Sequence, residues 1–183
     1  MKFPLYAFAA GATGLLLSPP ALAQSGLSLV LDRSERTVSV HRGSEVVRTY
    51  EVAVGKAGHA TPLGSWEFSQ VDINPDWTPP DSDWAADASY TPPGHADNPM
   101  GRVRMIFNRP YSIHGTDALH SIGKAASHGA VRIANRDGIE LAELLLKESG
   151  SWQGDAWYQD MLSNPTRMYE IPLERGIPIT IRQ

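Results

Sequence analysis

Residues 112–132 contain side chains of the types that acyl transfer requires. Two histidines, His114 and His128, are each followed by a glycine, and Arg132 comes four residues after the second. A histidine that closes a strand can act as a general base, and a tight turn can leave backbone N–H groups free to bind an oxyanion. An arginine can hold a carboxylate in bidentate geometry. The pattern suits acyl transfer on an acidic peptide, provided that a nucleophile is present.

A nucleophile is the group that this pattern lacks. Ala130 stands where the nucleophile is expected, and the chain contains no cysteine. Ser127 is the nearest hydroxyl, but it lies three residues away, and an odd offset along an extended turn directs it to the opposite side. The sequence therefore excludes thiol chemistry, a thiolate metal site and disulfide bonds.

Metal and nucleic-acid binding find no support in the sequence. His59, His95 and His120 join the two histidines named above, but their spacing matches no compact ligand pair such as i and i+4 on a helix. The net charge of −4 is mild, and no basic tract interleaved with aromatic residues is present. We expect no metal, no cofactor and no nucleic-acid partner.

The first 23 residues have the layout of a secretory signal peptide. Lys2 precedes an apolar run over 5–17, and Ala21-Leu22-Ala23 forms a small-x-small cleavage site. The run is too short for an anchor, which needs about 20 apolar residues, and no later stretch could cross a membrane. We expect export and a single mature domain over 24–183, long enough to bury a proper core.

The mature chain reads as mainly β. Short runs of β-branched residues with alternating polarity, separated by turn residues, predict antiparallel hairpins. The expected strands are 27–32, 36–41, 46–54, 65–71, 102–107, 111–114, 129–133, 168–171 and 177–181. An apolar stripe from Ile139 to Leu146 predicts a helix over 136–148, with Asn135 as its N-cap and its end near Gly150. A second helix is expected over 152–162.

Residues 72–100 are rich in proline, glycine and aromatic residues. A loop of this length inside a compact domain is usually functional, as a lid or a binding rim. Its aromatic residues indicate that it folds onto the domain, and we expect Trp77 and Trp84 to line or cap a substrate groove.

Many short motifs, in order along almost the whole mature chain, resemble the L,D-transpeptidase (YkuD) family. They are Thr61-Pro62-Leu63-Gly64, Asn74-Pro75-Asp76-Trp77-Thr78-Pro79-Pro80, Asp97-Asn98-Pro99-Met100-Gly101, His114-Gly115-Thr116, Ile122-Gly123, Ser127-His128-Gly129, Val131-Arg132 and Asp137. The resemblance implies a β-sandwich-like domain with one or two short helices. It also implies that peptidoglycan stem peptides are joined through a cysteine thioester, and the family's cysteine position is Ala130.

The resemblance also implies roles for individual residues. His114 matches the base that activates the thiol, His128 has an orienting role, and Gly129 belongs to the oxyanion region. Arg132 matches an arginine near the substrate. The implied substrate-binding set is Arg132, Gly115, Ser127, Trp77 and Trp84.

Three functions remain open after the sequence is considered. The first is an L,D-transpeptidase-type protein of cell-wall crosslinking, inactive or strongly impaired as written because of Ala130. The second is a non-catalytic peptidoglycan-binding or regulatory pseudoenzyme, and the third is a stem-peptide hydrolase or amidase on the same fold. In each case we expect a periplasmic monomer whose partner is a peptidoglycan stem peptide. The alanine itself is compatible with natural loss or with a deliberate Cys→Ala change.

Overall fold

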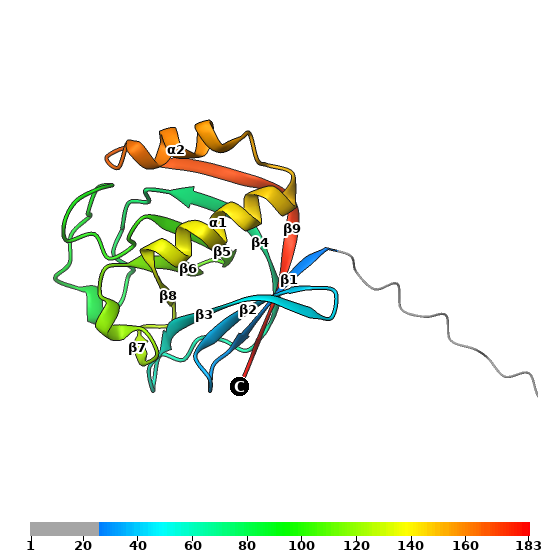
Figure 1. The fold of residues 1–183 in the computed structure, drawn as a ribbon. Coiled ribbons are helices and arrows are strands. Elements are labelled where there is room, and N and C mark those ends of the chain that lie inside the picture. The colour runs from blue at the N-terminus through cyan, green and yellow to red at the C-terminus, as the bar shows by residue number, and fades with distance from the viewer. Residues whose placement is uncertain (1–25) are drawn as a thin grey trace, which may run out of the picture.

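A computed structural model describes residues 26–183, so the expected signal peptide lies outside the described residues (Figure 1). The described part is mainly β with two α-helices, which confirms the predicted fold class. Its elements are β1 (Leu27–Asp32), β2 (Thr37–Arg42), β3 (Glu45–Gly55), β4 (Gly64–Ile73), η1 (Asp83–Ala85), β5 (Val103–Asn108), β6 (Tyr111–Thr116), η2 (Leu119–Ser121), β7 (Ala125–Ser127), β8 (Val131–Ala134), α1 (Asn135–Ser149), α2 (Asp155–Ser163) and β9 (Tyr169–Arg182).

The strands form one sheet that closes on itself. Their order is β2-β1-β9-β4-β5-β6-β8-β3-β7, and an additional antiparallel pairing of β2 with β3 joins distant positions of that order. Alternate residues of β1 and β2 are buried, as their alternating sequence predicts. The enclosed core contains apolar side chains from almost every strand, among them Leu29, Phe68, Met105, Ile113 and Ile179.

Helix α1 completes the core. Its stripe of Leu141, Ala142, Leu145 and Leu146 is buried, and the helix packs against β9, β6 and β5 (Figure 1). The helix ends at Gly150, whose φ of 92° allows the left-handed turn that glycine tolerates. These observations confirm the predicted helix. Asn135, however, is the first helical residue and not the N-cap, because its side chain bonds to other segments.

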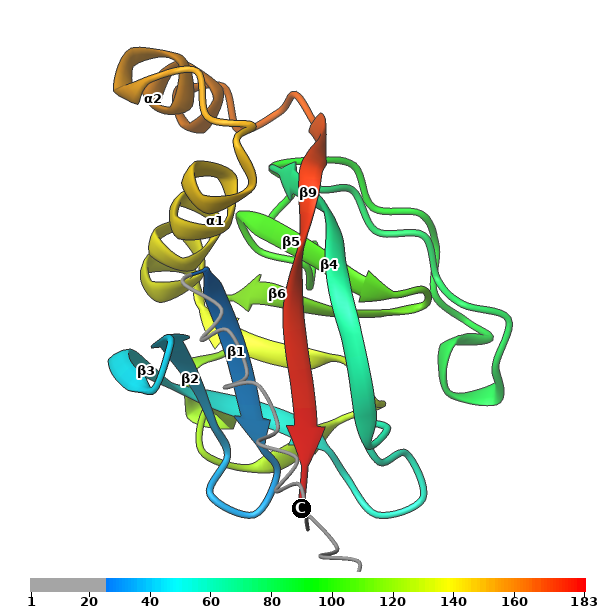
Figure 2. The ribbon, with the colours of Figure 1, turned by 90° about the vertical axis from the view of Figure 1, so that its right-hand side faces the viewer.

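Strand β9 is continuous where two strands were predicted. Figure 2 shows it running beside β4, with β1 on its other side along its later part only. Strand β1 pairs only with residues 179–182, so the earlier half of β9 pairs with β4 alone. An edge of this kind tolerates Pro172, which lacks an N–H donor. Pro172, which lies between the two predicted strands, is therefore part of one continuous strand.

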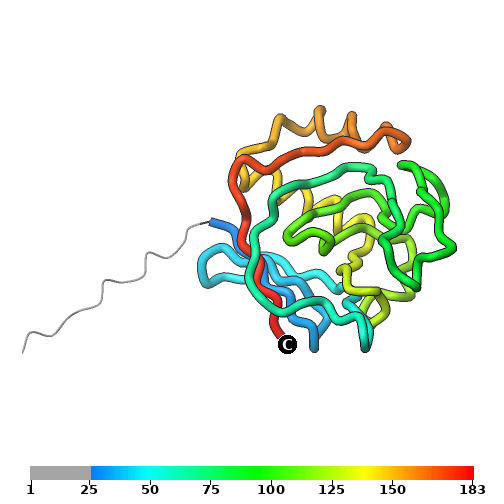
Figure 3. The backbone as a smooth tube through the Cα atoms, turned by 180° about the vertical axis from the view of Figure 1, so that it is seen from behind, coloured from blue at the N-terminus to red at the C-terminus, as the bar shows by residue number. Residues whose placement is uncertain are grey.

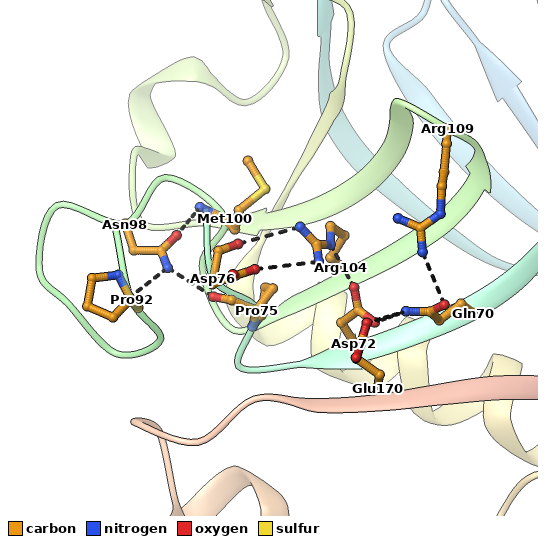
Figure 4. A network of polar contacts seen from close by, with 10 residues as sticks. All are labelled: Gln70, Asp72, Pro75, Asp76, Pro92, Asn98, Met100, Arg104, Arg109 and Glu170. Carbon is orange, nitrogen blue, oxygen red and sulfur yellow. Dashed lines mark hydrogen bonds and ion pairs between the residues drawn. The ribbon is translucent and has the colours of Figure 1, made fainter. Parts of the chain in front are cut away.

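The loop after β4 is folded against the domain. Trp77 and Thr91 form an isolated bridge with two backbone hydrogen bonds of 2.9 Å. The amide group of Asn98 donates to the carbonyls of Pro75 and Pro92 and accepts the N–H of Met100 (Figure 4). Figures 1 and 3 place this loop on the same side of the molecule as β7.

Among residues 26–183, no helix has the length and apolarity needed to cross a membrane.

Candidate active site

The parallel pairing of β6 with β8 positions the predicted site residues. Its register places Ile113 beside Val131 and His114 beside Arg132. The first pair is fully buried in the core. Because side chains alternate across a strand, the second pair lies on the other face of the sheet. Ala130, two residues before Arg132, continues that face.

His114 is a buried, neutral imidazole. Its side chain is only 3% exposed, and its Nδ1 lies 2.9 Å from the carbonyl oxygen of Gly115. A carbonyl can only accept, so Nδ1 carries the proton and Nε2 keeps a free lone pair. Burial is the main cause that lowers the pKa of His114 to about 4, and the charges of Arg132 and Arg104 contribute to this shift against the raising effect of the Gly115 hydrogen bond. At neutral pH the ring can therefore accept a proton.

Gly115 lies behind this histidine. A Cβ built on Gly115 would come within 2.2 Å of Asn135 Oδ1, so glycine is required for Asn135 to approach. Asn135 in turn accepts the N–H of Arg102 and donates to Asp117. Gly115 was predicted to contact substrate. It does not line either of the two cavities that are described below. Its position instead supports the base.

Ser127 holds the turn that leads to Ala130. Its hydroxyl donates to the carbonyl of Ala130 and accepts the N–H of Gly129 at 3.1 Å. The residue is 1% exposed. With its proton committed to Ala130, the hydroxyl is poorly placed to replace a nucleophile. The hydroxyl oxygen also occupies the N–H of Gly129, a residue that the family resemblance assigned to the oxyanion region.

Position 129 requires a glycine. Its φ is 116°, and a Cβ there would lie 3.0 Å from the ring of Tyr111. The turn is also held from outside, because Thr61 donates to the Gly129 carbonyl at 2.8 Å. Thr61 was noted in the sequence only as part of a motif, and its role depends on a contact between residues 68 positions apart.

Two adjoining cavities open at Ala130. The smaller has a volume of about 250 Å³ and is lined by Trp77, Trp84, Pro99, Met100, His114, Ser127, His128, Ala130 and Arg132. The larger, of about 660 Å³, shares five of these residues, Trp77, Trp84, Met100, His128 and Ala130. The base, the alanine and the arginine thus meet in one hollow, and both loop tryptophans contribute to its walls.

Arg104 and Arg132, two of the three arginines that line the cavities, differ in their partners. Arg104 lies 2.7 Å from the fully buried carboxylate of Asp72 and contacts Asp76 (Figure 4). The guanidinium of the half-buried Arg132 has no hydrogen-bond or ion-pair partner within the described residues. Burial lowers the pKa of Arg132, yet a guanidinium stays charged at neutral pH. Arg132 therefore presents an uncompensated cation, which favours an anionic ligand.

His128 is oriented by aromatic contacts. The indole of Trp84 stacks on its ring with a centroid distance of 4.1 Å and an interplanar angle of 5°. His59 meets it edge-on at 4.9 Å. Desolvation lowers the pKa of His128, and the nearby positive charge of Lys56 adds to the shift. The stack joins the long loop to the turn that holds Ala130.

No group of three histidine, aspartate or glutamate side chains in residues 26–183 is placed to hold a metal ion.

Comparison with known proteins identifies the family. The family model for YkuD, the L,D-transpeptidase catalytic domain, matches residues 27–162, which is most of the chain. The chain belongs to the YkuD family. The residues that line the two cavities all lie within the matched range.

Curated relatives of this YkuD-type chain are named L,D-transpeptidases. Probable L,D-transpeptidase YbiS of Escherichia coli K12 is 34% identical over 104 residues, which cover 52% of this chain and 34% of that protein. Probable L,D-transpeptidase ErfK/SrfK of Salmonella typhimurium LT2 is 30% identical over 160 residues, covering 75% and 52%. The aligned part thus spans about a third to a half of these relatives.

Solved structures share the fold at low identity. The L,D-transpeptidase from Mycobacterium smegmatis superposes with a TM-score of 0.53 at 17% identity, over 86% of this chain and 59% of that one. The L,D-transpeptidase from Stackebrandtia nassauensis superposes with a TM-score of 0.50 at 17% identity, over 90% of this chain and 62% of that one.

Acid should destabilise the protein through His114. In the unfolded chain the ring takes up a proton near its ordinary pKa of 6.5, whereas the folded ring does so only near 4. Protonation therefore favours unfolding, and the free energy of unfolding should fall by up to about 3 kcal/mol as the pH drops through this window. Denaturant unfolding between pH 4 and 8 measures the slope. His114→Gln should flatten it and the exposed control His120→Gln should not, and an unchanged slope in His114→Gln would contradict this account.

Proposed function

We propose that this chain binds the stem peptide of peptidoglycan in the hollow at Ala130, as an L,D-transpeptidase-type protein whose thiol step is missing. The observation that carries the proposal is that His114, Ala130 and the unpaired Arg132 line one cavity. Family membership supports a role in cell-wall crosslinking. The cavity matches that role, since an acidic peptide supplies the anion that Arg132 lacks.

The walls of the cavity suit a peptide with apolar and acidic parts. Trp77, Trp84, Pro99 and Met100 offer apolar surface, which favours burial of methylene groups. A carboxylate beside Arg132 would form charge-assisted hydrogen bonds. The neutral ring of His114 adds no charge to repel a cationic amine. These features favour a short acidic stem peptide.

A thiol at position 130 would complete the chemistry. Nε2 of His114 would take the thiol proton, and the sulfur would attack the peptide carbonyl to form a thioester, with the departing amine taking the proton from the ring. An incoming amine would then attack the thioester and release the sulfur. The methyl group of Ala130 cannot form this bond. Binding groups alone typically leave about 10³- to 10⁴-fold acceleration over water in enzymes without their nucleophile.

We infer that residues 1–23 direct export and that residues 24–183 act as one monomeric domain in the periplasm. The basic start, the short apolar run and the small-x-small triplet support this inference.

A non-catalytic peptidoglycan-binding module is the second candidate. Ala130 favours it, because the cavity, the base and the free arginine persist without the reacting atom. In that case the protein would hold stem peptides without joining them.

Ala130→Cys should restore acylation. With His114 as base, the new sulfur should form a covalent adduct with a carbapenem, seen as a mass increase of the intact protein. Ala130→Cys combined with His114→Gln is the matched control and should react at least about 100-fold more slowly. No adduct on the folded single variant would favour the binding module and reject the transpeptidase-type site.

Arg132→Gln should weaken binding of a disaccharide-tetrapeptide to the unaltered Ala130 chain. Loss of a charge-assisted pair worth about 1.5–3 kcal/mol predicts a rise in Kd of about 10- to 100-fold. Isothermal titration calorimetry measures it. The control is Arg136→Gln, since the Arg136 side chain is 92% exposed and pairs with Asp137. An equal Kd for both variants would remove Arg132 from the binding site.

A further inference from the structure

Thr61 is a buried hydroxyl that joins three segments. The residue is fully buried, and its Oγ1 accepts the N–H of Gly55 at 3.0 Å while donating to the carbonyl of Gly129 at 2.8 Å. Gly55 ends β3, and Gly129 belongs to the turn before Ala130. The single hydroxyl proton is therefore donated to the turn before Ala130, and the oxygen accepts a hydrogen bond from the end of β3.

The turn between Gly55 and Thr61 is folded tightly enough to make this contact. A Cβ on Gly55 would lie 2.1 Å from the carbonyl oxygen of His59, so only glycine lets the turn fold back on β3. The N–H of Lys56 also donates to the carbonyl of Ser127 at 3.0 Å. The two links place this turn directly against the segment that carries Ala130.

The link to Gly129 controls the direction of a backbone amide. The Gly129 carbonyl and the Ala130 N–H belong to one planar trans peptide unit, in which the two groups point in opposite directions. Thr61 draws the carbonyl toward the buried side, so the Ala130 N–H must point away from Thr61. Within the described residues this N–H has no hydrogen-bond partner, whereas the Gly129 N–H is taken by Ser127.

The hydrogen bonds of the Ser127 hydroxyl cannot supply the same control. They run to Gly129 and Ala130, inside the turn itself. They set the shape of the turn but not its orientation toward the sheet. A bond from outside the turn is required for that, and Thr61 supplies one directly to the peptide unit that carries Ala130.

We propose that Thr61 is a positioning residue of this site. By holding the Gly129 carbonyl, its hydroxyl orients the peptide of Ala130 so that the side chain at 130 faces His114 and the free N–H is available to an anionic oxygen. This proposal rests on the proposed function, because the orientation of the peptide at position 130 matters only if residue 130 contacts a ligand or carries a nucleophile.

The test uses the Ala130→Cys chain and its thiol reactivity, which requires no peptide. Alkylation by iodoacetamide is followed against pH by mass spectrometry. A thiol at position 130 that faces this cavity lies near the cation of Arg132 and should have an apparent pKa below its ordinary value of about 8.5. Adding Thr61→Val, which removes the hydroxyl and keeps the shape, should raise the apparent pKa by at least about one unit and slow carbapenem acylation by about 10-fold or more. Adding Thr61→Ser should leave both near the parent values.

Ser149→Ala is the matched control for the loss of a buried hydroxyl. The Ser149 hydroxyl is also fully buried and bridges two backbone groups, the carbonyl of Leu146 and the N–H of Ser151, at the end of α1. The Ser149→Ala variant should lower the thermal midpoint about as much as Thr61→Val does, but it should leave the alkylation profile unchanged. A merely structural role of Thr61 would make the two variants alike.

Unaltered alkylation in Thr61→Val would overturn the proposal. If that variant fails to fold, Thr61→Ser decides, because a folded serine variant with a shifted profile would show that the methyl group and not the hydroxyl matters. Failure of the proposed function looks different. The parent Ala130→Cys chain would then show no carbapenem adduct, while its alkylation profile would still respond to Thr61→Val.

Discussion

The register between β6 and β8 is the constraint on which the site depends. It places Ile113 beside Val131 in the core and therefore His114 beside Arg132 on the opposite face. A slip of one residue would turn His114 into the core and expose Ile113, at the cost of buried apolar area. The hydrophobic pattern thus maintains the geometry of the site, although no core residue takes part in its chemistry.

The electrostatic character of the site depends on which of its charged groups have a partner of opposite charge. The carboxylate of Asp72 neutralises Arg104, and burial keeps the ring of His114 neutral by lowering its pKa, against the raising effect of its hydrogen bond to Gly115. Arg132 keeps its charge without a partner in the described part of the chain. A neutral base beside a free cation makes the cavity receptive to an anion, and this arrangement needs no nucleophile to persist.

The alanine at position 130 is compatible with an otherwise complete fold because the surrounding turn is held by other groups. Ser127 closes the turn internally, Thr61 holds it from the β3 side, and the Trp84–His128 stack joins it to the long loop. The position itself contributes little packing, since Ala130 lies at the junction of two cavities. An alanine at this position therefore leaves the turn and the lining of both cavities in place.

Local pattern was sufficient for much of this protein. Alternating polarity predicted the strands, the apolar stripe predicted α1, and ordered motifs indicated the family and drew attention to His114, Ala130 and Arg132. Contacts between distant segments could not be derived in this way. Only the tertiary structure decided that β1 pairs in parallel with β9, that β9 is continuous through Pro172, that Gly115 makes room for Asn135, and that the hydroxyls of Ser127 and Thr61 hold the turn. Periodicity reports which face of an element is apolar, whereas the partner of a buried polar group depends on which segments the fold brings together.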